Sequence, residues 1–189
     1  MISQLIRSSL ILTLIFTLIT GLIYPLALTA ISQMLFLSKA NGSLIKVNGK
    51  TIGSKLIGQR FLKPEYFHPR PSQSNFDGLL SGGSNLGPTS KKLIERVQNT
   101  INLLQTETQN QKVPPDLAFT SGSGLDPHIS PEAAFFQAER VANVRGITKQ
   151  KLNKLINKHV EKRQLGFLGE PRVNVLELNI DLDKLSLSK

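Results

Sequence analysis

The sequence predicts an α+β protein: one N-terminal transmembrane helix, then a small soluble domain with short terminal strands and about three helices. Three observations predict this class. A charge-free apolar run fills residues 8–38, hydrophobic residues recur at helical spacing in three later segments, and turn-bounded or alternating apolar runs lie near both ends of the remainder. The expected divisions are a tail at 1–7, the membrane helix at 8–38 and the soluble domain at 39–189.

The apolar run is long enough to cross a bilayer. As a helix it would extend about 46 Å, against a hydrocarbon core of roughly 30 Å, so tilt or a kink would let it fit. A cleaved signal peptide is the alternative, with small residues at Ser38 and Ala40, but signal cores contain only about 7–15 apolar residues. Pro25 lies near the middle, removes one backbone hydrogen bond and predicts a bend.

Small hydroxyl residues recur along one face of this helix. They are Ser9, Thr13, Thr17 and Thr20. Such a stripe lets a second helix approach closely and hydrogen-bond across the contact, which predicts a partner in the membrane. In the alternative interpretation each hydroxyl bonds to a preceding carbonyl of its own helix, and the sequence leaves both open.

Charge limits the classes of partner but not the side of the membrane. The whole chain has a net charge of +10. All its acidic residues, and all its basic residues except Arg7, follow the apolar run. The positive-inside rule weakens for following domains longer than about 60 residues, so it does not orient this chain. With two Tyr, no Trp and no binding motif, nucleic acid is not an expected partner, whereas lipid headgroups or acidic proteins are. The absence of Cys excludes disulfides and thiolate metal sites.

The soluble domain begins with short apolar runs and a long loop. Asn41-Gly42 and Asn48-Gly49 are favoured in tight hairpin turns, so residues 40–61 predict two or three short strands. Residues 62–89 are rich in Pro, Gly, Ser and Asn. A loop of this length inside a compact domain is usually functional or disordered, and we expect an ordered or partner-held loop here.

Three helices and a closing strand are expected beyond this loop. The first begins after Thr89 or Ser90 and runs to about Thr108, the second lies between Ser130 and Gly146, and the third begins after Thr148. The expected apolar face of the first is Leu93, Ile94, Val97, Ile101 and Leu104, and that of the third is Leu152, Leu155, Ile156 and Val160. Leu176, Leu178, Ile180 and Leu182 alternate with polar residues and predict the closing strand.

The segment LSGGSNLGPTS, residues 80–90, suggests an anion cradle because it is rich in Gly and Ser and precedes a helical pattern. A P-loop is excluded, since Gly49-Lys50-Thr51 would need a glycine where Leu44 stands. Within the segment, Ser81, Gly82, Gly83 and Ser84 resemble the LSGGQ signature of ABC transporters. Nucleotide contact is therefore one hypothesis, and a glycine-rich turn is the other.

Other polar residues do not form a recognisable catalytic pattern. Asp126 and His128 could act as acid and base, but no nucleophile accompanies them and a metal would need more donors, so we expect loop hydrogen bonds and neither catalytic nor metal-binding residues. Arg70 lies between two prolines in a restricted backbone, which suits contact with an acid or a carbonyl. Gln137 is interpreted as a partner contact or a surface residue.

Eight blocks follow one another along the chain: TGLIYPLALTAISQ, ANGSLI, GSKLIGQRF, YFHPRPS, SGGSNLGP, SGSGLDPHISPEAA, RVANVRG and GEPRVNVLELN. Together, in this order, they resemble the KdpC family, the C subunits of Kdp-type potassium-transporting P-type ATPases. The resemblance covers nearly the whole chain. It implies a non-catalytic accessory subunit that assembles with a channel-like potassium-binding subunit, a P-type ATPase subunit and a small one-helix subunit.

The resemblance also implies a single-pass protein of the bacterial plasma (inner) membrane, with a cytoplasmic N-terminus and an extracytoplasmic soluble domain. The family is described as a catalytic chaperone that raises the pump's affinity for ATP, and residues 81–84 with Gln137 match that idea. ATP would be shared with the ATPase subunit, and no cofactor is expected on this chain alone. ATP is cytoplasmic, whereas the soluble domain is expected on the outer side of the membrane. We therefore expect the domain to brace partners, with His68 and Arg70 facing them. A nucleotide-binding module is the alternative.

Overall fold

The computed structural model describes residues 2–107 and 111–187 of the chain. These form two compact units, Met1–Leu44 and Ile45–Lys189, here called the helical unit and the folded unit. The combination of an apolar N-terminal helix with a region of helices and short strands confirms the predicted α+β class.

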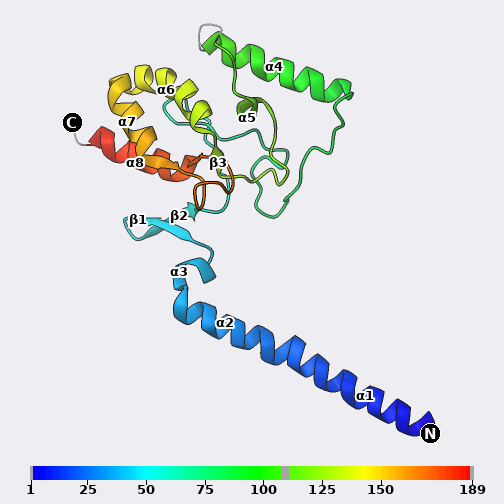
Figure 1. Cartoon of the computed structure of the whole chain (residues 1–189). Helices are drawn as coiled ribbons and strands as arrows, with labels where there is room; N and C mark the ends of the chain where they lie inside the picture. The colour runs from blue at the N-terminus through cyan, green and yellow to red at the C-terminus, as the bar shows by residue number, and fades with distance from the viewer. Residues whose placement is uncertain (1, 108–110, 188–189) are drawn as a thin grey trace. The chain divides into compact units, whose positions relative to one another are not determined.

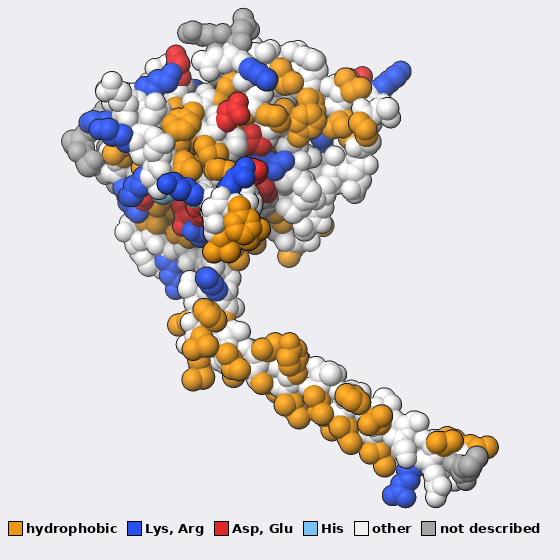
Figure 2. Space-filling view, in the orientation of Figure 1, with side chains coloured by type: hydrophobic (Ala, Val, Ile, Leu, Met, Phe, Trp, Pro, Cys, Tyr) orange, Lys and Arg blue, Asp and Glu red, His pale blue; other side chains and the backbone are white. Residues whose placement is uncertain are grey.

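The helical unit is a long apolar helix. Its segments are α1 (Ile2–Leu18), a π-helical turn (Ile19–Ile23) and α2 (Tyr24–Leu35), which run on as one continuous helix (Figure 1). Apolar side chains cover it along its length (Figure 2). The helix is long and apolar enough to cross a membrane, and it begins at Ile2, inside the segment expected as a tail. It ends where Phe36 leaves helical geometry, before the short helix α3 (Leu37–Ala40).

The π-helical turn lies directly before Pro25. Proline has no N–H, so the carbonyl of Gly21 loses its α-helical partner. The chain compensates by winding more widely, and the N–H of Tyr24 donates to the carbonyl of Ile19, five residues back. The loss of a hydrogen bond expected at this proline is therefore accompanied by a π turn within a helix that continues past it, and the bend stays a prediction.

A hairpin opens the folded unit. Strands β1 (Leu44–Val47) and β2 (Lys50–Ser54) pair across Asn48 and Gly49, whose φ angles of 51° and 77° suit the tight turn predicted there. The second predicted turn is wrong: Asn41 ends helix α3, so Asn41-Gly42 joins a helix to a strand.

The core of the folded unit packs three helices against a small sheet. The helices are α6 (Pro131–Arg145), α7 (Lys149–His159) and α8 (Val175–Leu187). The antiparallel sheet has the order β3 (His128–Ile129), β5 (Arg172–Asn174) and β4 (Val160–Glu161). The fully or almost fully buried apolar side chains include Phe67, Ile129, Ala133, Ala134, Ala138, Val141, Leu152, Ile156, Val173, Leu178 and Leu182.

The predicted helix boundaries in this core are confirmed. The hydroxyl of Ser130 accepts a hydrogen bond from the N–H of Ala133, and Gly146 ends the helix in the left-handed conformation with φ of 63°. The hydroxyl of Thr148 accepts from the N–H of Lys151 and starts α7. On α7, Leu152 and Ile156 are fully buried as expected.

The predicted closing strand is wrong beyond Asn174. The Asn174 side-chain oxygen accepts a hydrogen bond from the N–H of Glu177, 3.1 Å away, which starts a helix. The buried residues of α8 include Leu176 and a set at helical spacing, namely Val175, Leu178, Asn179 and Leu182. The alternating leucines were ambiguous because a buried polar residue, Asn179, completes the helical face.

The remaining helices lie outside this core. Helix α4 (Lys91–Glu107) begins after Ser90 as predicted, but its apolar stripe is only half-buried and Ile94 is exposed. The expected end at Thr108 lies outside the described residues. Helix α5 (Pro115–Ala118) and the two-residue strands β3 and β4 were not predicted, because elements this short carry no periodic signal.

Candidate functional site

Helix α6 holds the backbone of the segment Pro64–His68 through three of its side chains. Gln137 is only 2% exposed, and its Oε1 accepts the N–H of His68 at 2.8 Å while its Nε2 donates to the His68 carbonyl at 3.1 Å. Arg140 donates to the carbonyls of Pro64 and Tyr66. Arg145 donates from Nε to the Glu65 carbonyl at 2.7 Å. We call residues 64–71 the clamped segment.

A second amide holds the same segment from helix α8. Asn179, 1% exposed, accepts the N–H of Phe67 and donates to its carbonyl, both at 2.9 Å. The backbone N–H and carbonyl of Phe67 and of His68 are all hydrogen-bonded to buried side-chain amides. The segment is therefore fixed although it has no strand partner. The Phe67 side chain is thereby fully buried in the core.

These contacts correct the interpretation of Gln137 as a surface or partner residue. Besides the His68 backbone, its amide bonds to Arg140 at 2.9 Å and to the Ala133 carbonyl at 3.3 Å. Asn179, Arg140 and Arg145 were not singled out from the sequence. Their only local signal is that Arg140 and Arg145 share a helix face with Gln137, which does not identify the segment they hold.

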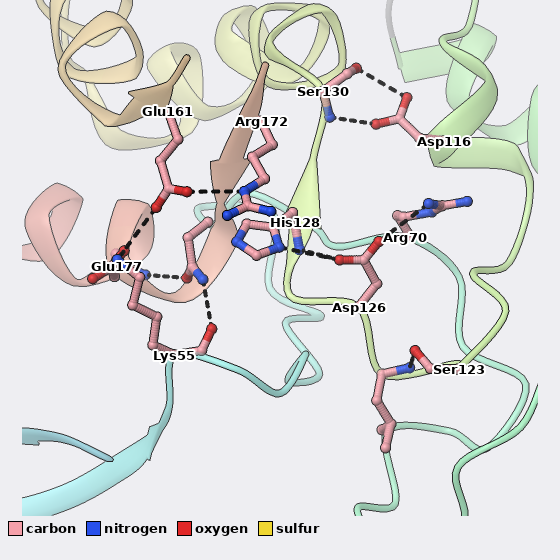
Figure 3. A network of polar contacts seen from close by, with 12 residues as sticks. Lys55, Arg70, Asp116, Ser123, Asp126, His128, Ser130, Glu161, Arg172 and Glu177 are labelled. Carbon is pink, nitrogen blue, oxygen red and sulfur yellow. Dashed lines mark hydrogen bonds and ion pairs between the residues drawn. The ribbon is translucent and has the colours of Figure 1, made fainter. Parts of the chain in front are cut away.

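Arg70, predicted to contact an acid or a carbonyl, does both within the folded unit (Figure 3). Its Nη1 lies 3.3 Å from Asp126 Oδ2, and its Nη2 lies 3.5 Å from the Thr120 carbonyl. The other oxygen of Asp126 accepts the His128 N–H at 3.0 Å and lies 3.4 Å from His128 Nδ1. The expected loop hydrogen bonding of His128 is confirmed. His68, likewise, places its ring Nε2 3.1 Å from the Lys63 carbonyl.

Two opposing effects set the pKa of Asp126. Burial raises it, but the hydrogen bonds from His128 and the charges of His128 and Arg70 outweigh burial, so the pKa lies below its ordinary value. Asp126 is therefore the ionised centre of this network.

Two further polar contacts surround this network. Asp116 accepts from the N–H of Ser130 at 2.7 Å and from its hydroxyl at 3.2 Å. Lys55 bridges Glu161 and Glu177 at 3.4 and 3.0 Å (Figure 3). The hydrogen bond to Glu177 raises the pKa of Lys55, against the effect of burial. Each contact links segments distant in sequence, which is the pattern of a structural network.

The network borders an open pocket of about 500 Å³. Glu132, Glu170 and Arg172 also line this pocket. His128 pairs with Asp126, whereas Ser130 pairs with Asp116 and caps α6, so these side chains form two separate pairs. Within residues 2–107 and 111–187, no group of three or more His, Cys, Asp or Glu side chains is placed to hold a metal ion.

The glycine tract Ser81–Ser84 packs against a second glycine-serine loop. The N–H of Gly82 donates to the Ser123 carbonyl at 2.8 Å, and the Ser81 hydroxyl lies 3.4 Å from the same oxygen. A Cβ on Gly124, whose φ is +69°, would lie 2.8 Å from the Gly82 carbonyl oxygen. A Cβ on Gly83 would lie 3.0 Å from the Gly122 carbonyl oxygen, whereas Gly82 has open space. Close approach of the two backbones therefore accounts for glycine at Gly83 and Gly124.

The tract is not at a helix start, because α4 begins only at Lys91. The contacts of the tract lead to Ser123, whereas those of Gln137 lead to His68 and Arg140. The tract and Gln137 therefore share no hydrogen-bond partner among these contacts. The hypothesis that both contact a nucleotide stays a prediction.

The hydroxyl stripe of the helical unit is exposed along α1 and the π turn, at Ser9, Thr13, Thr17 and Thr20. Thr20 donates to the Phe16 carbonyl of its own helix at 2.7 Å, as the alternative interpretation requires. The intermolecular role of the stripe stays a prediction.

Comparison with known proteins decides the family. A family model described as "K+-transporting ATPase, c chain" matches residues 6–184. The chain belongs to the KdpC family. A potassium-transporting ATPase KdpC subunit of Koribacter versatilis is 51% identical over 178 residues, which are 93% of this chain and 92% of the relative.

Other KdpC relatives agree along almost their full lengths. A potassium-transporting ATPase KdpC subunit of Rhodopseudomonas palustris is 48% identical over 94% of this chain and 96% of its own, and one of Bradyrhizobium diazoefficiens is 50% identical over 95% and 96%. The resemblance seen in the sequence is thus confirmed. As a KdpC protein, the chain is a membrane-associated subunit of a potassium-transporting ATPase, and its apolar helix is the candidate membrane span.

Proposed function

We propose that this KdpC chain is a non-catalytic subunit that braces assembly of a high-affinity, ATP-driven potassium uptake pump. Its partners are a channel-like potassium-binding subunit, the P-type ATPase subunit and a small one-helix subunit. The observation that carries the proposal is that Arg70, Asp126, His128 and Gln137, the polar residues best suited to chemistry, are engaged in holding the fold.

The proposal includes a topology. The apolar helix crosses the bacterial plasma membrane once, the N-terminus is cytoplasmic and the folded unit is extracytoplasmic. A helix of 34 residues supports a single crossing. Arg7, the single basic side chain near the N-terminal end of this helix, is compatible with a cytoplasmic N-terminus because the long following domain weakens the charge rule.

Sidedness is tested with single cysteines in a chain that has none. Asn157→Cys, on the exposed face of α7, should react with a membrane-impermeant thiol reagent in intact cells. Ser3→Cys, exposed near the other end of the chain, is the matched control and should react only after permeabilisation. The reverse pattern would refute the proposed topology.

The bracing role is tested by co-expressing the full chain with the other subunits and purifying through a tag on the ATPase subunit. The chain should co-purify, and its omission should lower recovery of the channel-like subunit and potassium-dependent ATP hydrolysis. The isolated chain should not hydrolyse ATP. A complex that assembles and works equally well without the chain would refute the proposal.

Contact with ATP, shared with the ATPase subunit, is the alternative. It predicts that changing Gly82 or Gln137 lowers the pump's ATP affinity while assembly and stability stay intact. The internal contacts of Gln137 favour the bracing role, because they make loss of stability the expected consequence of changing it.

A further inference from the structure

A groove between the clamped segment and helix α4 has the chemistry of a docking site. It encloses about 300 Å³, and its lining includes Arg60, Leu62, His68, Arg70, Phe76 and Leu103. Gln137 also borders it. One wall runs from His68 to Pro71. Gln137 fixes the His68 backbone and Asp126 holds the Arg70 side chain, so that wall is in place before any ligand arrives. A preformed wall lowers the entropic cost of binding.

The apolar part of the groove is left open. Leu62 and Leu103 both line it and are 66% and 64% exposed. The half-buried Phe76 and Leu104 also belong to the lining. Large apolar side chains gathered at a concave site mark a binding surface more reliably than scattered ones.

The polar part of the groove is cationic. Two arginines and one histidine line it, and its lining includes no carboxylate. Arg60 is exposed and makes no hydrogen bond or ion pair with any residue of the described chain. Arg70 is neutralised by Asp126, but its Nε is buried without a hydrogen-bond partner in the described part of the chain. Since Arg70 is already paired with Asp126, Arg60 is the arginine of the groove that is left to pair with a ligand.

We propose that this groove receives a segment of another pump subunit in which one Asp or Glu stands beside apolar side chains. The carboxylate pairs with Arg60, and the apolar neighbours pack between Leu62 and Leu103. This inference rests on the proposed function, since it names the contact by which the folded unit would brace a partner. Charge complementarity favours this occupant, because a purely apolar segment would leave Arg60 without an ionic partner.

The test uses the full chain co-expressed with the other pump subunits. A photo-crosslinking amino acid is placed at Leu103, and at Leu165 as a control that is 83% exposed and outside the groove lining. Leu103 should crosslink to one subunit at a peptide containing Asp or Glu, and Leu165 should not yield that peptide. A crosslink from Leu103 to lipid or to a second copy of this chain would overturn the proposal.

Charge reversal provides the second measurement. Arg60→Glu combined with Leu103→Asp should lower recovery of the crosslinked subunit at least about tenfold, because it removes an anchor and introduces repulsion. Lys151→Glu combined with Leu165→Asp makes the same change in net charge at exposed positions outside the groove lining and should leave recovery unchanged. Replacing the crosslinked carboxylate by Arg should restore assembly with Arg60→Glu.

The outcomes separate the two proposals. If the unmodified chain does not co-purify with the pump, the proposed function fails. If it does and the groove variants also co-purify at the unmodified level, only the groove assignment fails. Circular dichroism of the solubilised variants checks folding, and the crosslinking result decides the matter for any variant that does not fold.

Discussion

Replacing Gln137 by Met tests the clamp most directly. Methionine has similar length but cannot pair with the His68 backbone, whose N–H and carbonyl lie 2.8 and 3.1 Å from the glutamine amide. Each buried polar group left unpaired costs roughly 1–3 kcal/mol. Because the His68 groups are only partly buried, we expect the free energy of unfolding to fall by about 2–4 kcal/mol in total.

The measurement is urea unfolding of the detergent-solubilised full chain, followed by circular dichroism because the chain has no Trp. Hydrogen exchange of the His68 amide should accelerate in parallel. The matched control is Gln150→Met, at an exposed position of α7, which should change stability by no more than about 0.5 kcal/mol.

A Gln137→Met chain with unchanged stability and unchanged His68 exchange would refute the clamp. If that chain also lowered the ATP affinity of an intact pump, the nucleotide hypothesis would replace the structural explanation of this residue.

Three further predictions concern the loop contact, the ionic network and the membrane helix. Gly124→Ala should cost about 1–2 kcal/mol or more, because Gly124 has φ of +69° and its new Cβ would meet the Gly82 carbonyl at 2.8 Å, whereas Gly82→Ala, with open space, should be nearly neutral. Equal effects in urea unfolding would contradict the loop contact. The lowered pKa of Asp126 means that its stabilisation is present above its unfolded-state pKa of about 3.9 and is lost as pH falls through the folded-state value. The stability difference between wild type and Asp126→Asn should therefore be largest near neutral pH and shrink in acid, and a pH-independent difference would exclude this linkage. Pro25→Ala restores an N–H, so the π turn at residues 19–23 should convert to α-helix in NMR spectra of the micelle-bound chain. Unchanged chemical shifts there would show that the proline does not cause the turn.

Local features of this protein were predictable because their physics is local. The local run of apolar side chains is enough to make Ile2–Leu35 apolar enough for a membrane. The starts at Ser130 and Thr148, the end at Gly146 and the turn at Asn48-Gly49 each follow from side chains that bond to, or release strain in, their own backbone. The chain's order of motifs was also enough to indicate the KdpC family.

The tertiary structure decided which polar residues hold the fold. Asn179 bonds to the backbone of Phe67, which lies 112 positions earlier in the chain. Arg70 bonds to Asp126, which lies 56 positions later. A local pattern could not show these partners, so Gln137 was interpreted as a partner contact or a surface residue. For the same reason Asn179 was not recognised as a buried residue that completes the apolar face of a helix. The reason is energetic. A polar side chain is stable in the core only when a distant segment supplies its hydrogen bonds, and folding of the whole chain brings that segment into place.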